Sequence, residues 1–223
     1  MGRLFSFLMK IMIPREFTRR KLIRFPGLTA LLLLAVPSLT FQVYPEENLQ
    51  RKTDYILLYQ RDNGGWPKNY DRDQKPSAQE VINIRAKRGG NDATFDNGAT
   101  HTEVRLLADA FNSTGNIRYK NALLKGVELM LLTQYPNGGW PQRPNASGYS
   151  KHITFNDGAM IGVMTTLRDL ANDRDAYSFI DERLRTRCRN AVEKGILCIL
   201  KCQISVDGKR TAWCAQHDEK TFA

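Results

Sequence analysis

The chain has 223 residues, a length that suits one ordinary domain preceded by a leader and falls short of two full domains. Hydrophobic residues make up 42% of it, which supports a real core and argues against global disorder. The formal net charge is +10, but residues 1–26 alone hold seven basic side chains and one acidic side chain. The rest of the chain is only mildly basic, so we expect no nucleic-acid partner.

The first segment, residues 1–42, has the pattern of a signal peptide. The basic stretch RRKLIRF is followed by the apolar run LTALLLLAV, which has the length of a signal-peptide core. A membrane-spanning helix needs about 20 apolar residues, and extending this run that far crosses Pro26 and Pro37. We therefore expect a secreted or periplasmic protein without stable membrane association after signal removal. A single-span anchor is the alternative.

Residues 43–223 are expected to form one all-α domain. Apolar residues recur there with the helical period of 3.6 rather than with the alternation of strands. Gly and Pro cluster in the segments between the stripes, as loops require. The predicted helices cover residues 46–60, 99–112, 116–134, 158–171 and 177–203.

A repeated sequence, Asn-Gly-Gly-Trp-Pro, sets the register of these helices. It occurs at residues 63–67 and 137–141, and a degenerate third copy surrounds Trp213. The tryptophans Trp66, Trp140 and Trp213 are spaced by 74 and 73 residues. A helical hairpin repeated at this interval predicts a ring of paired helices. Repeat arrays need capping elements at their ends, and no such element follows the third copy. We therefore expect a chain that is incomplete at its C-terminal end.

Two related boxes follow the first two Trp-Pro loops, Phe95-Asp96-Asn97-Gly98-Ala99 and Phe155-Asn156-Asp157-Gly158-Ala159. One interpretation is helix capping, since Asp or Asn before a helix accepts hydrogen bonds from free backbone amides. The other interpretation is functional, because equivalent ends of paired helices converge at the mouth of a ring. Asp96 and Asp157 could bind a hard cation there or act as an acid/base pair.

Side chains beside the boxes are candidates for ligand contacts. His101 and His152 could hold a substrate hydroxyl or carboxylate, or could serve only as hydrogen-bonded or surface residues. Together with His217 they are too dispersed for a zinc motif. Trp66 and Trp140 are either hydrophobic plugs or faces on which a sugar stacks.

Four cysteines lie near the C-terminal end of the sequence. Their spacing indicates small buried apolar side chains, and a disulfide such as Cys202–Cys214 is the alternative that export would permit. Zinc binding is disfavoured, because no Cys-x-x-Cys motif or neighbouring histidine pair occurs. The cysteines are Cys188, Cys198, Cys202 and Cys214.

The segments NGGWPKN, ATFDNGATHTEVR, QYPNGGWPQ, HITFNDGAM and TAWCAQHD, taken together, resemble the pectate lyases of polysaccharide lyase family 10. The resemblance covers roughly residues 50–223 and is carried by the order of several motifs. It implies an (α/α)3 toroid, export, a polygalacturonate (pectate) substrate and calcium (Ca2+). We also expect a monomer.

The reaction that this resemblance implies is β-elimination, which yields 4,5-unsaturated oligogalacturonides. A base removes the C5 proton of galacturonate, and calcium on the neighbouring carboxylate offsets the charge that develops. Asp96 and Asp157 match acidic positions of the family and are assigned to calcium binding and catalysis. The predicted substrate-binding residues are Trp66, Lys68, Asn97, His101, Trp140, His152 and Asn156.

The base that the resemblance implies is an arginine shortly after CAQHDEKT, beyond Ala223. Arg105, Arg143 and Arg210 do not match that position. We therefore expect these 223 residues alone to be inactive. Two alternatives stay open: a glycoside hydrolase on an α/α toroid that uses Asp96 and Asp157 as acid and base, and a non-catalytic carbohydrate-binding protein.

Overall fold

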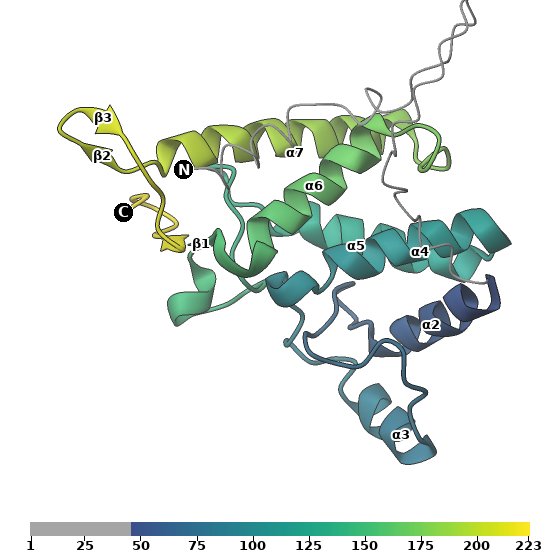
Figure 1. Cartoon of the computed structure of the whole chain (residues 1–223). Helices are drawn as coiled ribbons and strands as arrows, with labels where there is room; N and C mark the ends of the chain where they lie inside the picture. Colours follow the sequence, from purple (N-terminus) through teal and green to yellow (C-terminus); the bar gives the residue numbers. More distant parts are fainter. Residues whose placement is uncertain (1–45) are drawn as a thin grey trace, which may run out of the picture.

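The computed structural model describes residues 46–223, and the predicted signal peptide of residues 1–42 lies outside them. Within that range the chain is mostly helical, which confirms the all-α prediction (Figure 1). No helix among these residues is long and apolar enough to span a membrane. The α-helices are α2 (Glu46–Tyr59), α3 (Ala78–Ala86), α4 (His101–Thr114), α5 (Ile117–Thr133), α6 (Ala159–Asn172) and α7 (Glu182–Lys201).

Short elements connect these helices. The one-turn 3-10 helices are η2 (Asp96–Gly98), η3 (Gly148–Lys151) and η4 (Asn156–Gly158). The strands are β1 (Ile153–Thr154), β2 (Ser205–Val206), β3 (Lys209–Arg210) and β4 (Gln216–His217). β1 pairs antiparallel with β4, so that Ile153 faces His217, and β2 pairs antiparallel with β3. The β1–β4 pair fastens the C-terminal segment beside the second box.

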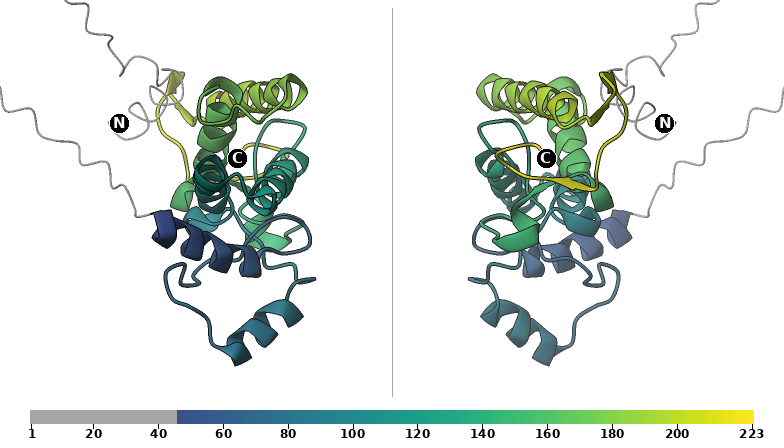
Figure 2. Two further views of the ribbon diagram at one scale, coloured as in Figure 1. Left: turned by 90° about the vertical axis from the view of Figure 1, so that its right-hand side faces the viewer. Right: turned by 90° about the vertical axis from the view of Figure 1, so that its left-hand side faces the viewer.

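The long helices stack as hairpins. α4 packs against α5 and α6 packs against α7, while α4 also contacts α2 and α6 (Figures 1 and 2). The turn between α4 and α5 is sharp because Gly115 takes a left-handed conformation (φ 67°) and the Asn116 side chain then caps α5. This side-by-side stacking of helical hairpins is the arrangement that an α/α toroid requires.

The core fills the space between the hairpins. It is built from the apolar stripes that the helical period predicts, and its members include side chains with no exposed surface. Examples from four different helices are Ile56, Leu107, Leu123 and Leu167.

The helix α3 was not predicted. It has one buried residue, Ile84, so it carries no apolar stripe that sequence periodicity could detect. Its start is a capping box, in which Ser77 Oγ accepts from Glu80 N (3.3 Å) and the Glu80 carboxylate accepts from Ser77 N (2.7 Å). α3 projects away from the hairpins in every view (Figures 1 and 2).

Candidate active site

The two Asn-Gly-Gly-Trp-Pro loops make the same hydrogen bonds. Gln60 Nε2 donates to the carbonyl oxygens of Gly64 and Ala122, each at 2.9 Å. In the second copy Gln134 Nε2 donates to Gly138 O at 3.0 Å and to a carbonyl of α7 at 2.8 Å. Each glutamine therefore joins its own loop to the next hairpin, which explains why it recurs with the motif.

The tryptophans of these loops are structural. Trp66 and Trp140 have no exposed surface. Their indole N–H groups donate to Ile56 O (2.8 Å) and Met130 O (2.7 Å). Trp213 makes the equivalent bond by donating its indole N–H to Ile199 O of α7 at 2.7 Å, so it belongs to the third copy of the repeat. The prediction that Trp66 and Trp140 stack on a sugar is wrong for this structure, because neither ring offers a free face.

The two boxes lie beside each other and do not cap helices. They form η2 and η4, which contact each other where α4 and α6 begin. The residues that precede α4 and α6, Thr100 and Gly158, make no side-chain capping bond. The capping interpretation is therefore wrong. The functional interpretation fits the placement of the boxes at the starts of two neighbouring helices.

The acidic residues of the two boxes occupy different places. Asp96 takes the first Asx position and is 2% exposed, whereas Asp157 takes the second position and is exposed. Asn97 and Asp157, which correspond, both adopt a left-handed backbone with φ 51°. Asn156 is the counterpart of Asp96. The site is therefore asymmetric, with one buried carboxylate and one at the surface.

Asp96 is held by two side chains from the Trp-Pro loops. Lys68 Nζ and Gln142 Nε2 (3.1 Å) both donate to its Oδ2 atom. Its Oδ1 atom is buried and has no hydrogen-bond partner among the described residues. Lys68 follows the first Trp-Pro and Gln142 follows the second, so the repeat itself could have identified Gln142, which was not predicted.

A second buried oxygen lies in the neighbouring box. Asn156 Oδ1 is also buried without a partner in the part of the chain that the structure describes. Its amide group is oriented by donation from Nδ2 to Asp157 Oδ2. Calcium prefers carboxylate and amide oxygens. The free oxygens of Asp96 and Asn156, together with the Asp157 carboxylate, thus fit a hard cation.

Residues at the start of α4 add a buried charged group. Glu103 has no exposed surface, and its Oε1 accepts from Tyr70 Oη (2.9 Å) and Arg72 Nε (2.6 Å). Burial raises the pKa of Glu103, and Arg72 partly offsets this shift. This network was not predicted. No motif signals it, because Tyr70 and Arg72 lie in the irregular connection before α3.

His101 is neutral over most of the pH range in which such a site would work. Burial lowers the pKa of His101 to about 4, and the positive charges of Arg105 and Arg72 add to this effect. Its Nε2 atom is buried without a partner among residues 46–223. The ring packs over Gly162 of α6, where any Cβ atom would overlap it.

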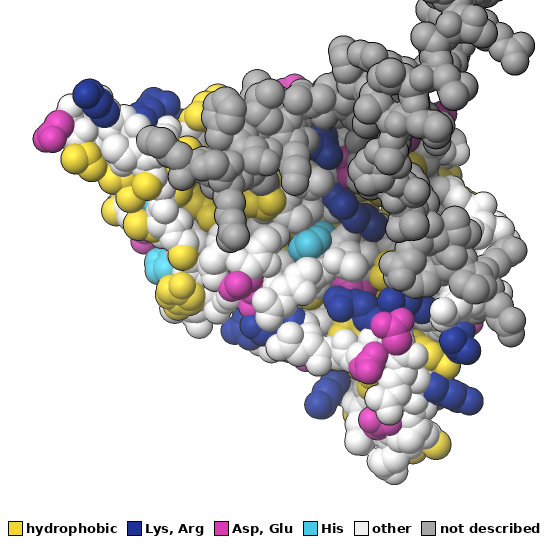
Figure 3. All heavy atoms as spheres, in the orientation of Figure 1, with side chains coloured by type: hydrophobic (Ala, Val, Ile, Leu, Met, Phe, Trp, Pro, Cys, Tyr) yellow, Lys and Arg dark blue, Asp and Glu magenta, His cyan; other side chains and the backbone are white. Residues whose placement is uncertain are grey.

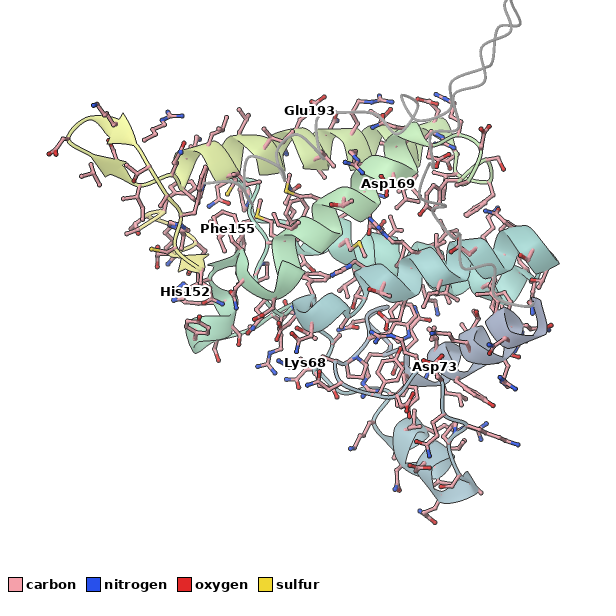
Figure 4. The ribbon with its side chains drawn as sticks, in the orientation of Figure 1. Lys68, Asp73, His152, Phe155, Asp169 and Glu193 are labelled. Atoms are coloured by element: carbon pink, nitrogen blue, oxygen red, sulfur yellow. The ribbon has the colours of Figure 1, made fainter. Side chains whose placement is uncertain are left out.

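His152 belongs to a separate cluster. Its Nδ1 atom hydrogen bonds with Glu219 Oε2 at 3.0 Å, and the other Glu219 oxygen pairs with Lys151 Nζ at 2.9 Å. The ligand atoms of His152, Asp218 and Glu219 lie within 4.8 Å of one another, so they could hold a metal ion. The Lys151 ammonium competes for Glu219. Figure 4 shows His152 and Phe155 on the side where α6 begins.

The cysteines are free thiols. Cys188, Cys198 and Cys202 are buried, which confirms the apolar interpretation for these three, and Cys214 is exposed. Among the described residues no disulfide forms, so the Cys202–Cys214 alternative is not seen.

The stacked helical hairpins define the chain as part of an α/α toroid fold. The family described as pectic acid lyase matches residues 60–223. The chain belongs to this pectic acid lyase family.

Two similar solved structures come from Cellvibrio cellulosa. One is a family 10 polysaccharide lyase, with 37% identity and a TM-score of 0.68. The other is a mutant family 10 polysaccharide lyase in complex with trigalacturonic acid, with 36% identity and a TM-score of 0.69. Each match covers 79% of this chain and 55% of the other, so the chain spans little more than half the length of these structures. Among curated proteins none matches.

Proposed function

We propose that this chain contributes the calcium-binding and uronate-binding part of a pectate lyase that cleaves polygalacturonate by β-elimination. The observation that carries the proposal is the arrangement of Asp96. This buried carboxylate has one oxygen held by Lys68 and Gln142, and its other oxygen has no hydrogen-bond partner among the described residues. The segment that carries it, η2, contacts η4 of the second box. Membership of the pectic acid lyase family supports the choice of substrate and reaction.

Asp96, Asn156 and Asp157 are the residues that would hold calcium. Their side chains supply oxygen atoms from η2 and η4, two segments of the chain that contact each other. When bound, calcium would reduce the charge on the uronate carboxylate and so make the C5 proton more acidic. Lys68 and Gln142 keep the Asp96 carboxylate in one orientation, which lowers the entropic cost of ordering this side chain when calcium binds.

Lys68 can position the substrate. The Lys68 side chain is 42% exposed, and its ammonium group retains donors for a uronate carboxylate beyond the one given to Asp96. His101 Nε2 is buried and its ring packs over Gly162, so we assign no substrate contact to His101.

The chain's arginines near this site are already engaged. Arg72 is paired with Glu103, and Arg105 is paired with Asp169 at 3.2 Å. We therefore assign the removal of the C5 proton to neither of them. They keep the local potential positive around His101, which favours the approach of an acidic sugar.

A glycoside hydrolase is less well supported. Such an enzyme needs one carboxylic acid that donates a proton to the leaving oxygen. Both side-chain partners of Asp96 donate hydrogen bonds to it, so the structure arranges Asp96 as an acceptor.

The signal-peptide pattern of residues 1–42 is consistent with export, which we propose together with this function.

The test is calorimetric binding of trigalacturonate, with calcium and with a chelator. We expect binding that needs calcium and that Asp96→Asn reduces at least about tenfold, because one charged ligand is lost. Asp175→Asn, an exposed acid outside the boxes, is the matched control. Ultraviolet absorbance of the unsaturated product then separates a lyase from a hydrolase. Equal binding with the chelator would refute the calcium role.

A further inference from the structure

A groove lies between α2, α3 and α5, and none of the residues that line it belongs to the two boxes. Its volume is about 640 Å³. Its lining is largely apolar and carries four cations and one acid, Asp54. In the space-filling view, Lys and Arg side chains lie over α2 and α3 with Asp and Glu side chains between them (Figure 3). The cations that line the groove are Arg85, Arg88, Arg118 and Lys125.

The second repeat shows which of these cations is structural. Arg118 of α5 pairs with Asp54 of α2 at 3.2 Å. Arg187 of α7 pairs with Glu128 of α5 at 2.8 Å, at the corresponding positions one repeat later. Both pairs join neighbouring repeats, so Arg118 has a role that needs no ligand.

Two of the other cations, Arg85 and Arg88, are extra to the repeat, whereas Lys125 has a counterpart in Lys194 of α7. Arg85 and Arg88 come with α3, the insertion between α2 and α4, and the contact between α5 and α7 has no such insertion. Arg88 is paired only loosely with Asp62, at 3.5 Å, and both side chains are more than half exposed. Arg85 and Lys125 form no ion pair with another described residue. The half-buried Tyr55 ring also lines the groove.

We propose that this groove is a second binding site for an acidic sugar chain. Arg85 and Lys125 bind uronate carboxylates, Arg88 supports them, and Tyr55 contacts the apolar face of a sugar ring. The nature of the sugar rests on the proposed function, since a polygalacturonate chain carries one carboxylate per residue. The groove would hold a long chain to the protein independently of the Asp96 site.

Binding of a long oligogalacturonate in the presence of a chelator tests this inference, because calcium bridging is then absent. We expect Arg85→Gln/Lys125→Gln to weaken binding about five- to tenfold. The matched control is Arg183→Gln/Lys194→Gln, which removes the same charge from exposed positions of α7, where Lys194 is the repeat counterpart of Lys125. Equal weakening by both variants would overturn the groove and leave only a general charge effect.

A second readout locates the contact directly. Carbodiimide coupling joins a uronate carboxylate to a nearby amine, and peptide mass spectrometry identifies the lysine. We expect Lys125 to be labelled well above Lys194, and equal labelling would contradict the proposal. Asp96→Asn should leave this labelling unchanged. Failure of the lyase proposal therefore appears at Asp96, and failure of this inference appears at Lys125.

Discussion

Gly138→Ala is the sharpest test of the structural role of the repeated loop. Gly138 has φ +95°, and a Cβ atom there would lie 2.5 Å from the carbonyl carbon of Lys194 and 3.1 Å from Gly195 N. Both neighbours are backbone atoms of α7, so no side-chain rotation relieves the overlap. The left-handed conformation costs roughly 1–2 kcal/mol and overpacking costs a further 1–3 kcal/mol or so. We expect a loss of about 2–5 kcal/mol in the free energy of unfolding.

The control is Gly148→Ala. Gly148 also has a positive φ, +57°, but an added Cβ atom would meet nothing within 4 Å. It should therefore cost only the conformational share, about 1–2 kcal/mol. Denaturant unfolding of both variants measures the difference. If Gly138→Ala proved no worse than Gly148→Ala, the close approach of the loop to α7 would be refuted.

Three further predictions concern the buried groups. The pKa of His101 in the folded protein, about 4, lies below its usual value of 6.5, so protonation favours unfolding. The free energy of unfolding should therefore fall by roughly 3 kcal/mol in total as the pH drops from 6.5 to 4. Comparison of denaturation with that of His101→Asn isolates this loss, and a parallel decline in both proteins would contradict it. Glu103→Gln should lower the free energy of unfolding by about 2 kcal/mol, since Arg72 loses its charged partner. Tyr70→Phe should lower it by about 1 kcal/mol, and a larger loss for Tyr70→Phe than for Glu103→Gln would contradict the network. A thiol reagent should label Cys214 in the native protein at least about tenfold faster than the three buried cysteines. Mass spectrometry of timed samples measures the rates, and equal labelling of all four cysteines would contradict the burial of Cys188, Cys198 and Cys202.

The long helices could be predicted because packing dictates their pattern. α4, α5 and α6 bury one stripe each, and their observed bounds lie within two residues of those expected from the helical period. The repeat also gave the correct order of hairpins, since the Gln and Trp bonds recur with it. α3 escaped detection because it buries almost nothing, although the capping box of Ser77 and Glu80 marks its start.

The site was predictable only in part. Asp96, Asn156 and Asp157 stand out because their boxes repeat, yet the sequence does not reveal that Asp96 is buried and Asp157 exposed. Trp66 resembles a sugar-binding residue by type, and only its burial shows that it is a plug.

Partners that are distant in the sequence also escape such reasoning. Glu219 reaches His152 across 67 residues because β4 pairs with β1. Glu103 meets Tyr70 and Arg72 from a connection with no regular pattern. Such contacts follow from the tertiary fold, and no local spacing encodes them.

The central claim is that the two boxes form one calcium-dependent site for a uronate chain. Its most direct test is the affinity for trigalacturonate, measured by calorimetry with calcium and with a chelator, for the unaltered chain and for Asp96→Asn. We predict binding that requires calcium and falls at least about tenfold in the variant. Equal affinities in all of these conditions would contradict the account.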